Sequence, residues 1–159
     1  MNRFASLRTV VTLGLGLTVI VGLSSCASSG GGADGEHMTL DRGTGLFAPC
    51  PDSPNCVSTQ AQDEEHGMPS LSYGDSQAEA KQRMVDIINA MPRSTIVAES
   101  DDYLHVEFRS RIFRFVDDVE IYFDDANKAV QFRSASRVGY SDMGVNRNRM
   151  TEISRQFAQ

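Results

Sequence analysis

The feature that most constrains the fold is a series of strand-like segments separated by short turns in the second half of the chain. The clearest is residues 103–109, in which Leu104, Val106 and Phe108 alternate with polar side chains. The other segments with strand character are residues 95–99, 110–116, 119–123 and 130–137. Short turns predict antiparallel neighbours, because a parallel pair needs a crossover of about a dozen residues. The blurred alternation of residues 110–116 predicts a bulge or bend, and the alternation elsewhere predicts one covered sheet face and one wet face.

Two helices flank these strands. Ser76 and Glu79 have the spacing of a capping box, and the apolar residues behind them predict a helix over residues 76–91. A closing helix is predicted over residues 146–158. The apolar faces of the two helices carry Ala80, Met84, Ile87, Ile88 and Met91, and Met150, Ile153 and Phe157. The predicted fold class is therefore α+β, with an antiparallel sheet of three to four strands and both helices packed on one face.

The amino-terminal residues predict export and a lipid anchor. A basic start and an apolar run over residues 10–23 are typical of a secretory signal, and the run is shorter than the roughly 18–20 residues of a membrane-spanning helix. Leu-Ser-Ser-Cys at residues 23–26 resembles the lipobox of bacterial lipoproteins, in which the cysteine thiol takes a diacylglycerol and the new amino terminus is acylated, for example with palmitate. The alternative is an ordinary secretory signal in which Cys26 occurs by chance. Alanine and serine after Cys26, rather than aspartate, favour the outer membrane over the inner one in the enteric sorting rule that this resemblance suggests.

The chain is expected to divide into a signal peptide over residues 1–25, an acylated cysteine and flexible Gly- and Ser-rich tether over residues 26–45, and a single domain over residues 46–159. The signal contains Arg3 and Arg8 and no acid, so the mature chain has 15 − 2 = 13 basic residues against 21 acidic ones, a net charge of −8. This charge argues against sequence-independent nucleic-acid binding. It also gives no electrostatic attraction to an anionic membrane, so membrane attachment is assigned to the acyl chains on Cys26.

A proline-rich segment opens the predicted domain. Residues 46–60 contain three prolines, which exclude a regular helix or a central strand. Cys50 and Cys56 are the only cysteines left after Cys26, and an even pair in an exported protein favours a disulfide. A metal site or two free thiols are the alternatives, although His37 and His66 lack ligand spacing. No cofactor and no metal are predicted.

Two long motifs carry a resemblance to a known family. They are Cys-Pro-Asp-Ser-Pro-Asn-Cys-Val-Ser at residues 50–58 and Arg-Ser-Ala-Ser-Arg-Val-Gly-Tyr-Ser-Asp-Met-Gly-Val-Asn-Arg at residues 133–147. In this order they resemble the family called domain of unknown function 1499, whose bacterial members are often small exported or membrane-anchored proteins. The resemblance covers about residues 46–157 and implies one compact domain, with the two motifs as its special regions. It carries no catalytic roles, because the family has no established activity.

The arginine-rich end of the chain holds the candidate binding site. Its residues are Arg109, Arg133, Arg137, Asp142, Asn146 and Arg147. We expect the strand residues and the first turn of the closing helix to converge there, with Asp142 or Asn146 satisfying free N–H groups at the helix start. If Asp142, Glu107 and Glu120 pair with the arginines, the cluster is a structural clasp. If they do not reach, an anionic small molecule, a lipid headgroup or a protein partner is the natural complement.

Catalytic residues are few, so a non-catalytic binding protein is favoured over an enzyme. The enzymatic alternative is a hydrolase that uses Ser134 or Ser136 as nucleophile with His105 as base. No Gly-x-Ser-x-Gly elbow and no Gly-rich phosphate loop is present in the sequence. The two classes differ in one observable, which is whether a His105 nitrogen lies near a serine hydroxyl.

Overall fold

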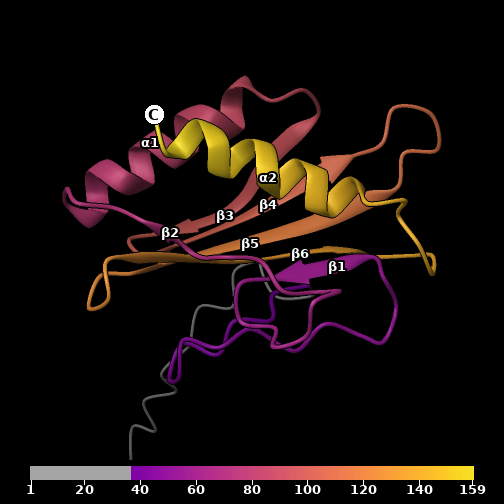
Figure 1. Cartoon of the computed structure of the whole chain (residues 1–159). Coiled ribbons are helices and arrows are strands. Elements are labelled where there is room, and N and C mark those ends of the chain that lie inside the picture. Colours follow the sequence, from indigo (N-terminus) through magenta and orange to yellow (C-terminus); the bar gives the residue numbers. More distant parts are fainter. Residues whose placement is uncertain (1–36) are drawn as a thin grey trace, which may run out of the picture. The chain divides into compact units, whose positions relative to one another are not determined.

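The computed structural model describes residues 37–159, which form one antiparallel sheet covered by two helices (Figure 1). The strands are β1 (Cys56–Ser58), β2 (Leu71–Ser72), β3 (Ser94–Ser100), β4 (Tyr103–Arg109), β5 (Val116–Asp124) and β6 (Ala129–Ser136), and the helices are α1 (Gln77–Ala90) and α2 (Val145–Phe157). The strand order is β1-β6-β5-β4-β3, and β2 also pairs with β6. The predicted α+β class is confirmed. The signal peptide, Cys26 and the tether as far as residue 36 lie outside the described residues.

The sheet has six strands instead of the predicted three to four. The two additional strands, β1 and β2, contain three and two residues and lie along the same outer side of β6. Strands this short have no alternation to detect, so periodicity misses them. The position of β1 at the edge agrees with the prediction that the proline-rich segment contains no central strand.

Residues 110–115 leave the sheet and form an exposed loop between β4 and β5. The blurred alternation therefore marks the end of one strand and the start of the next, and the prediction that strand character continues through this segment is wrong. The loop closes where the Ser110 N–H donates to the Phe115 carbonyl at 2.8 Å and Phe115 N–H donates to Ser110 Oγ at 2.9 Å. A true bulge occurs in β3, where the register shifts between Ile96 and Ala98.

Both helices pack on the same sheet face, as predicted, and Figure 1 shows them side by side above it. The capping box at the start of α1 is present: Ser76 Oγ accepts from Glu79 N–H, and the Glu79 carboxylate accepts from Ser76 N–H. The buried residues of the helices are Ala80, Met84, Ile87 and Ile88 in α1 and Asn146, Met150, Ile153 and Phe157 in α2. The apolar core they form with the sheet extends from Val57 to Phe157 along the chain.

The second sheet face is also covered, and the prediction that it is wet is wrong. Tyr103, His105 and Glu120 point away from the helices, yet each is buried. The cover is a segment of residues 39–48, which we call the covering segment; Figure 1 shows it on the opposite side of the sheet from α1 and α2. Residues 39–45 were expected in the tether, but they hydrogen-bond to the sheet and to one another.

The covering segment is a tight loop held at both ends. The Ala48 N–H donates to the Thr39 carbonyl at 3.2 Å, and Asp41 and Leu46 form an antiparallel bridge. Gly45 lies against the sheet with a φ of 70°, and a Cβ added there would meet the Tyr122 ring at 3.1 Å. Glycine is therefore required at this position for both its conformation and its close approach.

The predicted disulfide between Cys50 and Cys56, just after the covering segment in the chain, is present.

Candidate functional site

The two sequence motifs meet at Asn55, a buried residue between the bridged cysteines. The Asn55 carbonyl accepts from Ser136 N–H at 3.0 Å and from Asn146 Nδ2 at 3.1 Å. Asn55 Nδ2 donates to the Gly139 carbonyl at 2.6 Å. Asn55 therefore joins the first motif to three elements of the second motif through its backbone carbonyl and its side chain. These elements are the end of β6, the following loop and the start of α2.

Asn146 is the centre of this junction and is only 1% exposed. Its Oδ1 accepts from Ser134 Oγ and from Arg149 Nη1, and its Nδ2 donates to Asp142 Oδ2 at 2.8 Å. The Asp142 carboxylate also accepts from Asn146 N–H at 2.7 Å and from Gly144 N–H at 2.9 Å. The expectation that Asp142 satisfies free N–H groups at the helix start is confirmed by these contacts.

Asp117 completes the polar network on the helix side of the sheet. It accepts from Ser136 Oγ and from Arg149 Nη2, each at 2.6 Å. The Arg149 guanidinium also lies over the Phe108 ring, 4.5 Å from its centroid. We call this set the helix-side network; its members are Asn55, Asp117, Ser134, Ser136, Asp142, Asn146 and Arg149. Its one arginine is paired with an aspartate, so the network has the features of structural support for the loop between β6 and α2.

Arg147 projects to a different place. Its guanidinium donates to the carbonyl of Gly67 at 3.1 Å and to that of Glu65 at 2.6 Å. Both acceptors lie in the loop between β1 and β2, which Arg147 therefore fastens to α2. Arg109 pairs with Glu107 beside it on β4.

The face under the covering segment carries a second polar set, which we call the strand-side layer. Its members are Tyr103, His105, Glu107, Arg109, Asp118, Glu120, Arg133 and Arg137. Glu120, 0% exposed, accepts from Thr39 N–H at 2.7 Å, Thr39 Oγ1, Leu40 N–H at 3.1 Å and Tyr103 Oη at 2.8 Å. Burial and the nearby Glu120 carboxylate raise the pKa of Tyr103. Glu120 is thus the anchor that holds the covering segment to the sheet.

Arg137 joins two carboxylates of this layer. Its Nε and Nη2 donate to Asp118 at 2.7 Å, and Nη2 also donates to Glu107 Oε1 at 2.6 Å. His105 Nε2 lies 2.7 Å from Asp118 Oδ1. Burial opposes ionisation of Asp118, but the hydrogen bonds from Arg137 and His105 outweigh it and lower its pKa to about 2. The same bond to Asp118 raises the pKa of Arg137 despite partial burial.

Arg133 differs from the other arginines of the set. Its side chain forms no hydrogen bond or ion pair with any residue in the described range, and its buried Nε has no acceptor. Its direct neighbour across the sheet is Glu120, whose oxygens accept from the covering segment and Tyr103 instead. Burial lowers the pKa of Arg133, and the Glu120 and Asp118 carboxylates oppose that shift. His105 Nδ1, on the same face, is a second buried nitrogen without a partner.

The predicted convergence into one cluster is wrong. Arg133 and Arg137 lie in the strand-side layer, Asp142 and Asn146 lie in the helix-side network, and Arg147 reaches the loop before β2. The cause is the alternation of strands: Arg133 in β6 and Arg137, which directly follows it, point to one face of the sheet, whereas the helix that carries Asn146 packs on the other face. Glu107 and Asp118, rather than Asp142, supply the counter-charge of Arg137.

The hydrolase alternative loses its base for the same reason. Ser134 and Ser136 point to the helix side and bond to Asn146 and Asp117, whereas His105 points to the opposite face and bonds to Asp118. A serine without a base within reach is not activated. Within residues 37–159, no group of three or more His, Cys, Asp or Glu side chains is arranged to hold a metal ion.

Several important residues were not predicted. They are Asn55, Asp117, Asp118 and Arg149. The Asp117-Asp118 pair was the available signal, because two consecutive acids in a strand place one carboxylate on each face, opposite the arginines. Asn55 and Arg149 have no comparable signal, since their partners are distant in the sequence.

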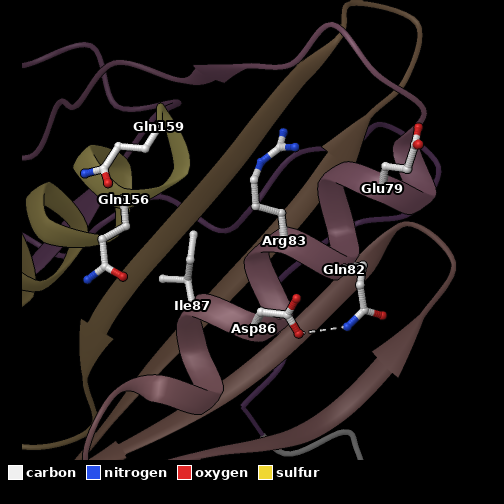
Figure 2. Close-up of a pocket in the computed structure, with 7 residues that line it drawn as sticks. All are labelled: Glu79, Gln82, Arg83, Asp86, Ile87, Gln156 and Gln159. Carbon is white, nitrogen blue, oxygen red and sulfur yellow. Dashed lines mark hydrogen bonds between the residues drawn. The ribbon is translucent and has the colours of Figure 1, made fainter.

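Two hollows on the surface differ in character. One hollow lies between α1 and the carboxyl end of α2, as Figure 2 shows. Its volume is about 450 Å³. There Arg83 pairs with Asp75 at 2.6 Å and lies over the Phe157 ring, and Gln82 donates to Asp86 at 2.9 Å. Arg83 Nε is buried without an acceptor, but the two Nη groups of the same guanidinium donate to Asp75, so we do not place the site there.

The other hollow, about 400 Å³, lies between the β4–β5 loop and the β6–α2 loop. It is lined by apolar side chains such as Phe115, Val138 and Val145, with Asp117 and Asp142 at its polar side. Both carboxylates already accept hydrogen bonds from the helix-side network. This hollow therefore offers an apolar surface rather than a free charge.

Comparison with known proteins places the domain in a family. The family described as Protein of unknown function (DUF1499) matches residues 47–157, which include both motifs, the sheet and both helices. No curated protein and no solved structure matches the chain. None of the helices in residues 37–159 is long and apolar enough to cross a membrane. With more than two thirds of its residues covered, this chain belongs to the DUF1499 family.

Proposed function

We propose that the protein is a non-catalytic cell-envelope lipoprotein that binds an oxyanion through Arg133. The oxyanion is a carboxylate or a phosphate, carried by a small molecule, a lipid headgroup or a protein partner. The single observation that supports this assignment is that Arg133 is half-buried and has no acceptor within residues 37–159. Buried donors normally have partners, so an unpaired guanidinium calls for an external acceptor.

The neighbouring carboxylates support the proposal because other groups already occupy them. Glu120 accepts from the covering segment and Tyr103, and Asp118 accepts from Arg137 and His105. Nε of Arg133 is enclosed, but its Nη donors are not among the buried atoms without a partner, so they remain available for a two-oxygen ligand, which the planar guanidinium suits.

The charge of the strand-side layer sets the expected affinity. Arg109, Arg133 and Arg137 balance Glu107, Asp118 and Glu120, so the layer is neutral before an anion binds. The ligand is therefore attracted by local hydrogen-bond donors and not by a net positive field. We expect modest affinity for a free anion that changes little with ionic strength, because interactions of partly buried charges are weakly screened.

The test uses inorganic phosphate as a probe and compares Arg133→Gln with Arg155→Gln. Arg155 is an exposed arginine paired with Glu152 on α2 and is the matched control for loss of one positive charge. Phosphate at ten times its dissociation constant should stabilise the wild-type protein by about 1.4 kcal/mol relative to chloride of equal ionic strength. The control should keep this stabilisation and Arg133→Gln should lose it.

The structural explanation for Arg133 predicts the opposite pattern. If Arg133 only supports the fold, Arg133→Gln lowers the melting temperature in chloride and phosphate has no specific effect on any of the variants. Absence of phosphate stabilisation of the wild type, or its persistence in Arg133→Gln, would refute the proposal.

The envelope location rests on the sequence alone. The lipobox ending at Cys26 supports acylation of that thiol, and the alanine and serine that follow it support the outer membrane. Several acyl chains on one terminus give stable attachment, whereas a single chain binds a bilayer only marginally.

A further inference from the structure

Exposed apolar side chains gather in two loops at one end of the sheet. The loops are residues 110–115, between β4 and β5, and residues 137–144, between β6 and α2; together we call them the loop end. Nine large apolar side chains are exposed in residues 37–159, and six of them belong to the loop end. These six are Ile112, Phe113, Phe115, Val138, Tyr140 and Met143. Met143 is 94% exposed and Ile112 is 79% exposed, so the core does not account for them.

The sheet register places the two loops next to each other. β4 ends and β5 begins with Arg109 opposite Val116, and Ser136 at the end of β6 is opposite Asp117. The Arg137 N–H donates to the Val116 carbonyl at 3.1 Å, which joins the bases of the two loops. Figure 1 shows both loops projecting from the same end of the sheet. The 400 Å³ hollow separates them and is lined by residues of both.

The backbone of the loop end is held in a defined and strained conformation. Arg114 and Met143 have positive φ angles of 59° and 56°, although neither is glycine. Such a conformation is unfavourable for an ordinary side chain and persists where the surrounding structure imposes it. The Phe113 and Phe115 rings stack with centroids 5.5 Å apart, so the aromatic side chains form one surface instead of separate contacts. A rigid apolar surface of this kind is suited to a partner and costs little to order on binding.

Arginines are interleaved with the apolar residues, and this identifies the chemistry of the partner. Arg111 and Arg114 flank Ile112 and Phe113, and neither arginine pairs with an acid in the part of the chain that the structure describes. Apart from Arg137, which is paired with Asp118 and Glu107, the two loops contain two arginines and one aspartate, a local charge of +1, on a chain with a formal net charge of −6. Side chains that combine apolar bodies with cationic ends are typical of surfaces that enter the headgroup region of an anionic bilayer.

The length of the chain before the domain is compatible with this partner. Cys26 precedes His37 by eleven residues, which span at most about 36–40 Å when extended. The longest strand, β5, has nine residues and is about 30 Å long. A domain anchored through Cys26 can therefore turn its loop end to the membrane that holds the anchor.

We infer that the loop end is a second, peripheral membrane-binding surface, which inserts Ile112, Phe113, Tyr140 and Met143 among anionic lipid headgroups while Arg111 and Arg114 contact the phosphates. The surface is separate from the anion site proposed at Arg133, which lies on the strand-side face. It differs from the expectation that the acyl chains alone contact the membrane, because that expectation was based on net charge and not on its local distribution.

The experiment measures vesicle binding without the lipid anchor. Residues 27–159 contain the whole described core and are used as the reference protein. Binding is measured by co-sedimentation with vesicles of phosphatidylcholine containing 30 mol% phosphatidylglycerol, and with vesicles of phosphatidylcholine alone. We expect binding to the anionic vesicles that weakens with salt, and much weaker binding to the uncharged ones.

Two pairs of variants separate the apolar contribution from the cationic one. Ile112→Ser with Phe113→Ser should reduce the partition constant at least about tenfold, whereas Val97→Ser, at an exposed apolar residue on the edge strand β3, should leave it unchanged. Arg111→Gln with Arg114→Gln should reduce binding to anionic vesicles about fivefold for each arginine. The charge-matched control is Lys128→Gln with Arg155→Gln, at two cations outside the loop end.

Three results would overturn the inference. The first is absence of vesicle binding by a protein whose circular dichroism and melting curve show that it is folded. The second is binding that is the same on charged and uncharged vesicles, or that is unchanged in both loop-end variants. The third is concentration-dependent self-association through Ile112 and Phe113 without vesicle binding, which would assign the loop end to a second copy of the chain. Because every substitution is at an exposed side chain, the variants are expected to stay folded.

Discussion

Replacing Arg137 by alanine tests whether the strand-side layer stabilises the fold. Arg137 pairs with Asp118 at 2.7 Å and with Glu107 at 2.6 Å. The side chains are 23% exposed for Arg137, 14% for Glu107 and 7% for Asp118. The substitution therefore removes the shared cation from two largely buried carboxylates, and only Glu107 keeps a second arginine, Arg109.

The pKa of Asp118 gives a first estimate of the cost. A decrease from its usual 3.8 to about 2 corresponds to about 2.5 kcal/mol, at 1.36 kcal/mol per pKa unit. His105 supplies part of this and remains in the variant. Removing one partner of a buried ion pair costs about 3–5 kcal/mol, and the partial exposure of Arg137 places it at the lower end. We expect Arg137→Ala to lose about 2–4 kcal/mol at pH 7, or about 8–15 °C in melting temperature.

The pH dependence follows from the direction of the shift. The pKa of Asp118 is lower in the folded state than in the unfolded chain, so its contribution to stability is complete above about pH 4. That contribution is lost as the pH falls from about 4 to about 2, because the folded carboxylate then takes up a proton. The difference in stability between wild type and Arg137→Ala should consequently become smaller over this range.

Urea unfolding followed by circular dichroism at pH 7, 4.5 and 3 measures both effects. Arg155→Ala is the control, because this exposed arginine pairs only with Glu152, and such surface pairs often contribute nothing measurable. A loss below about 0.5 kcal/mol at pH 7, or a loss that is the same at pH 7 and pH 3, would refute the reasoning. It would mean that Arg137 does not hold the two carboxylates together in solution.

Three further predictions concern other parts of the chain. Cys50→Ser with Cys56→Ser should cost about 2–3 kcal/mol in the same unfolding assay, and two alkylatable thiols in fresh wild-type protein would contradict the bridge. Asn146→Ala should lower the free energy of unfolding by about 2–4 kcal/mol, because it leaves several buried partners without a hydrogen bond. Asn148→Ala, at an exposed residue of the same helix, should have little effect. Equal losses in the two variants would show that the junction around Asn146 does not stabilise the fold. Cys26→Ala should leave an unprocessed or soluble form, and a variant that still fractionates with membranes would argue against acylation.

Local pattern was sufficient for much of the fold. The capping box at Ser76 and Glu79 and the spacing of the apolar residues behind it predicted α1 within one residue at each end. The alternation of residues 103–109 predicted β4 with its observed bounds. In these segments the local signal and the tertiary packing agree, because the face that is apolar in sequence is the face that the core requires.

The candidate site was predicted less well, because its geometry depends on which face of the sheet each side chain occupies. Strand parity correctly sent Arg133 and Arg137 away from Phe132, but the prediction still brought them together with Asn146. Once the helix packs on the Phe132 face, Asn146 must lie on the opposite side of the sheet from both arginines. The alternation of a strand predicts which of its side chains share a face of the sheet. Only the packing of α2 decides which of the two faces the helix covers.

The sequence by itself determined the class of fold, the bounds of every long element except β5 to within one residue, the pairing of Cys50 with Cys56 and the family. All of these depend on short-range periodicity, on turn chemistry or on contiguous motifs. The tertiary structure alone decided that the second sheet face is covered. The covering segment is held by hydrogen bonds between Thr39 and Glu120, which are 81 residues apart in the sequence. No periodic pattern in the sequence predicts this contact. The same long-range contact takes up both oxygens of Glu120 and so leaves Arg133 without an acceptor. The physical reason is that alternation reports which side chains share a face, whereas burial and pairing depend on what another part of the chain places against that face.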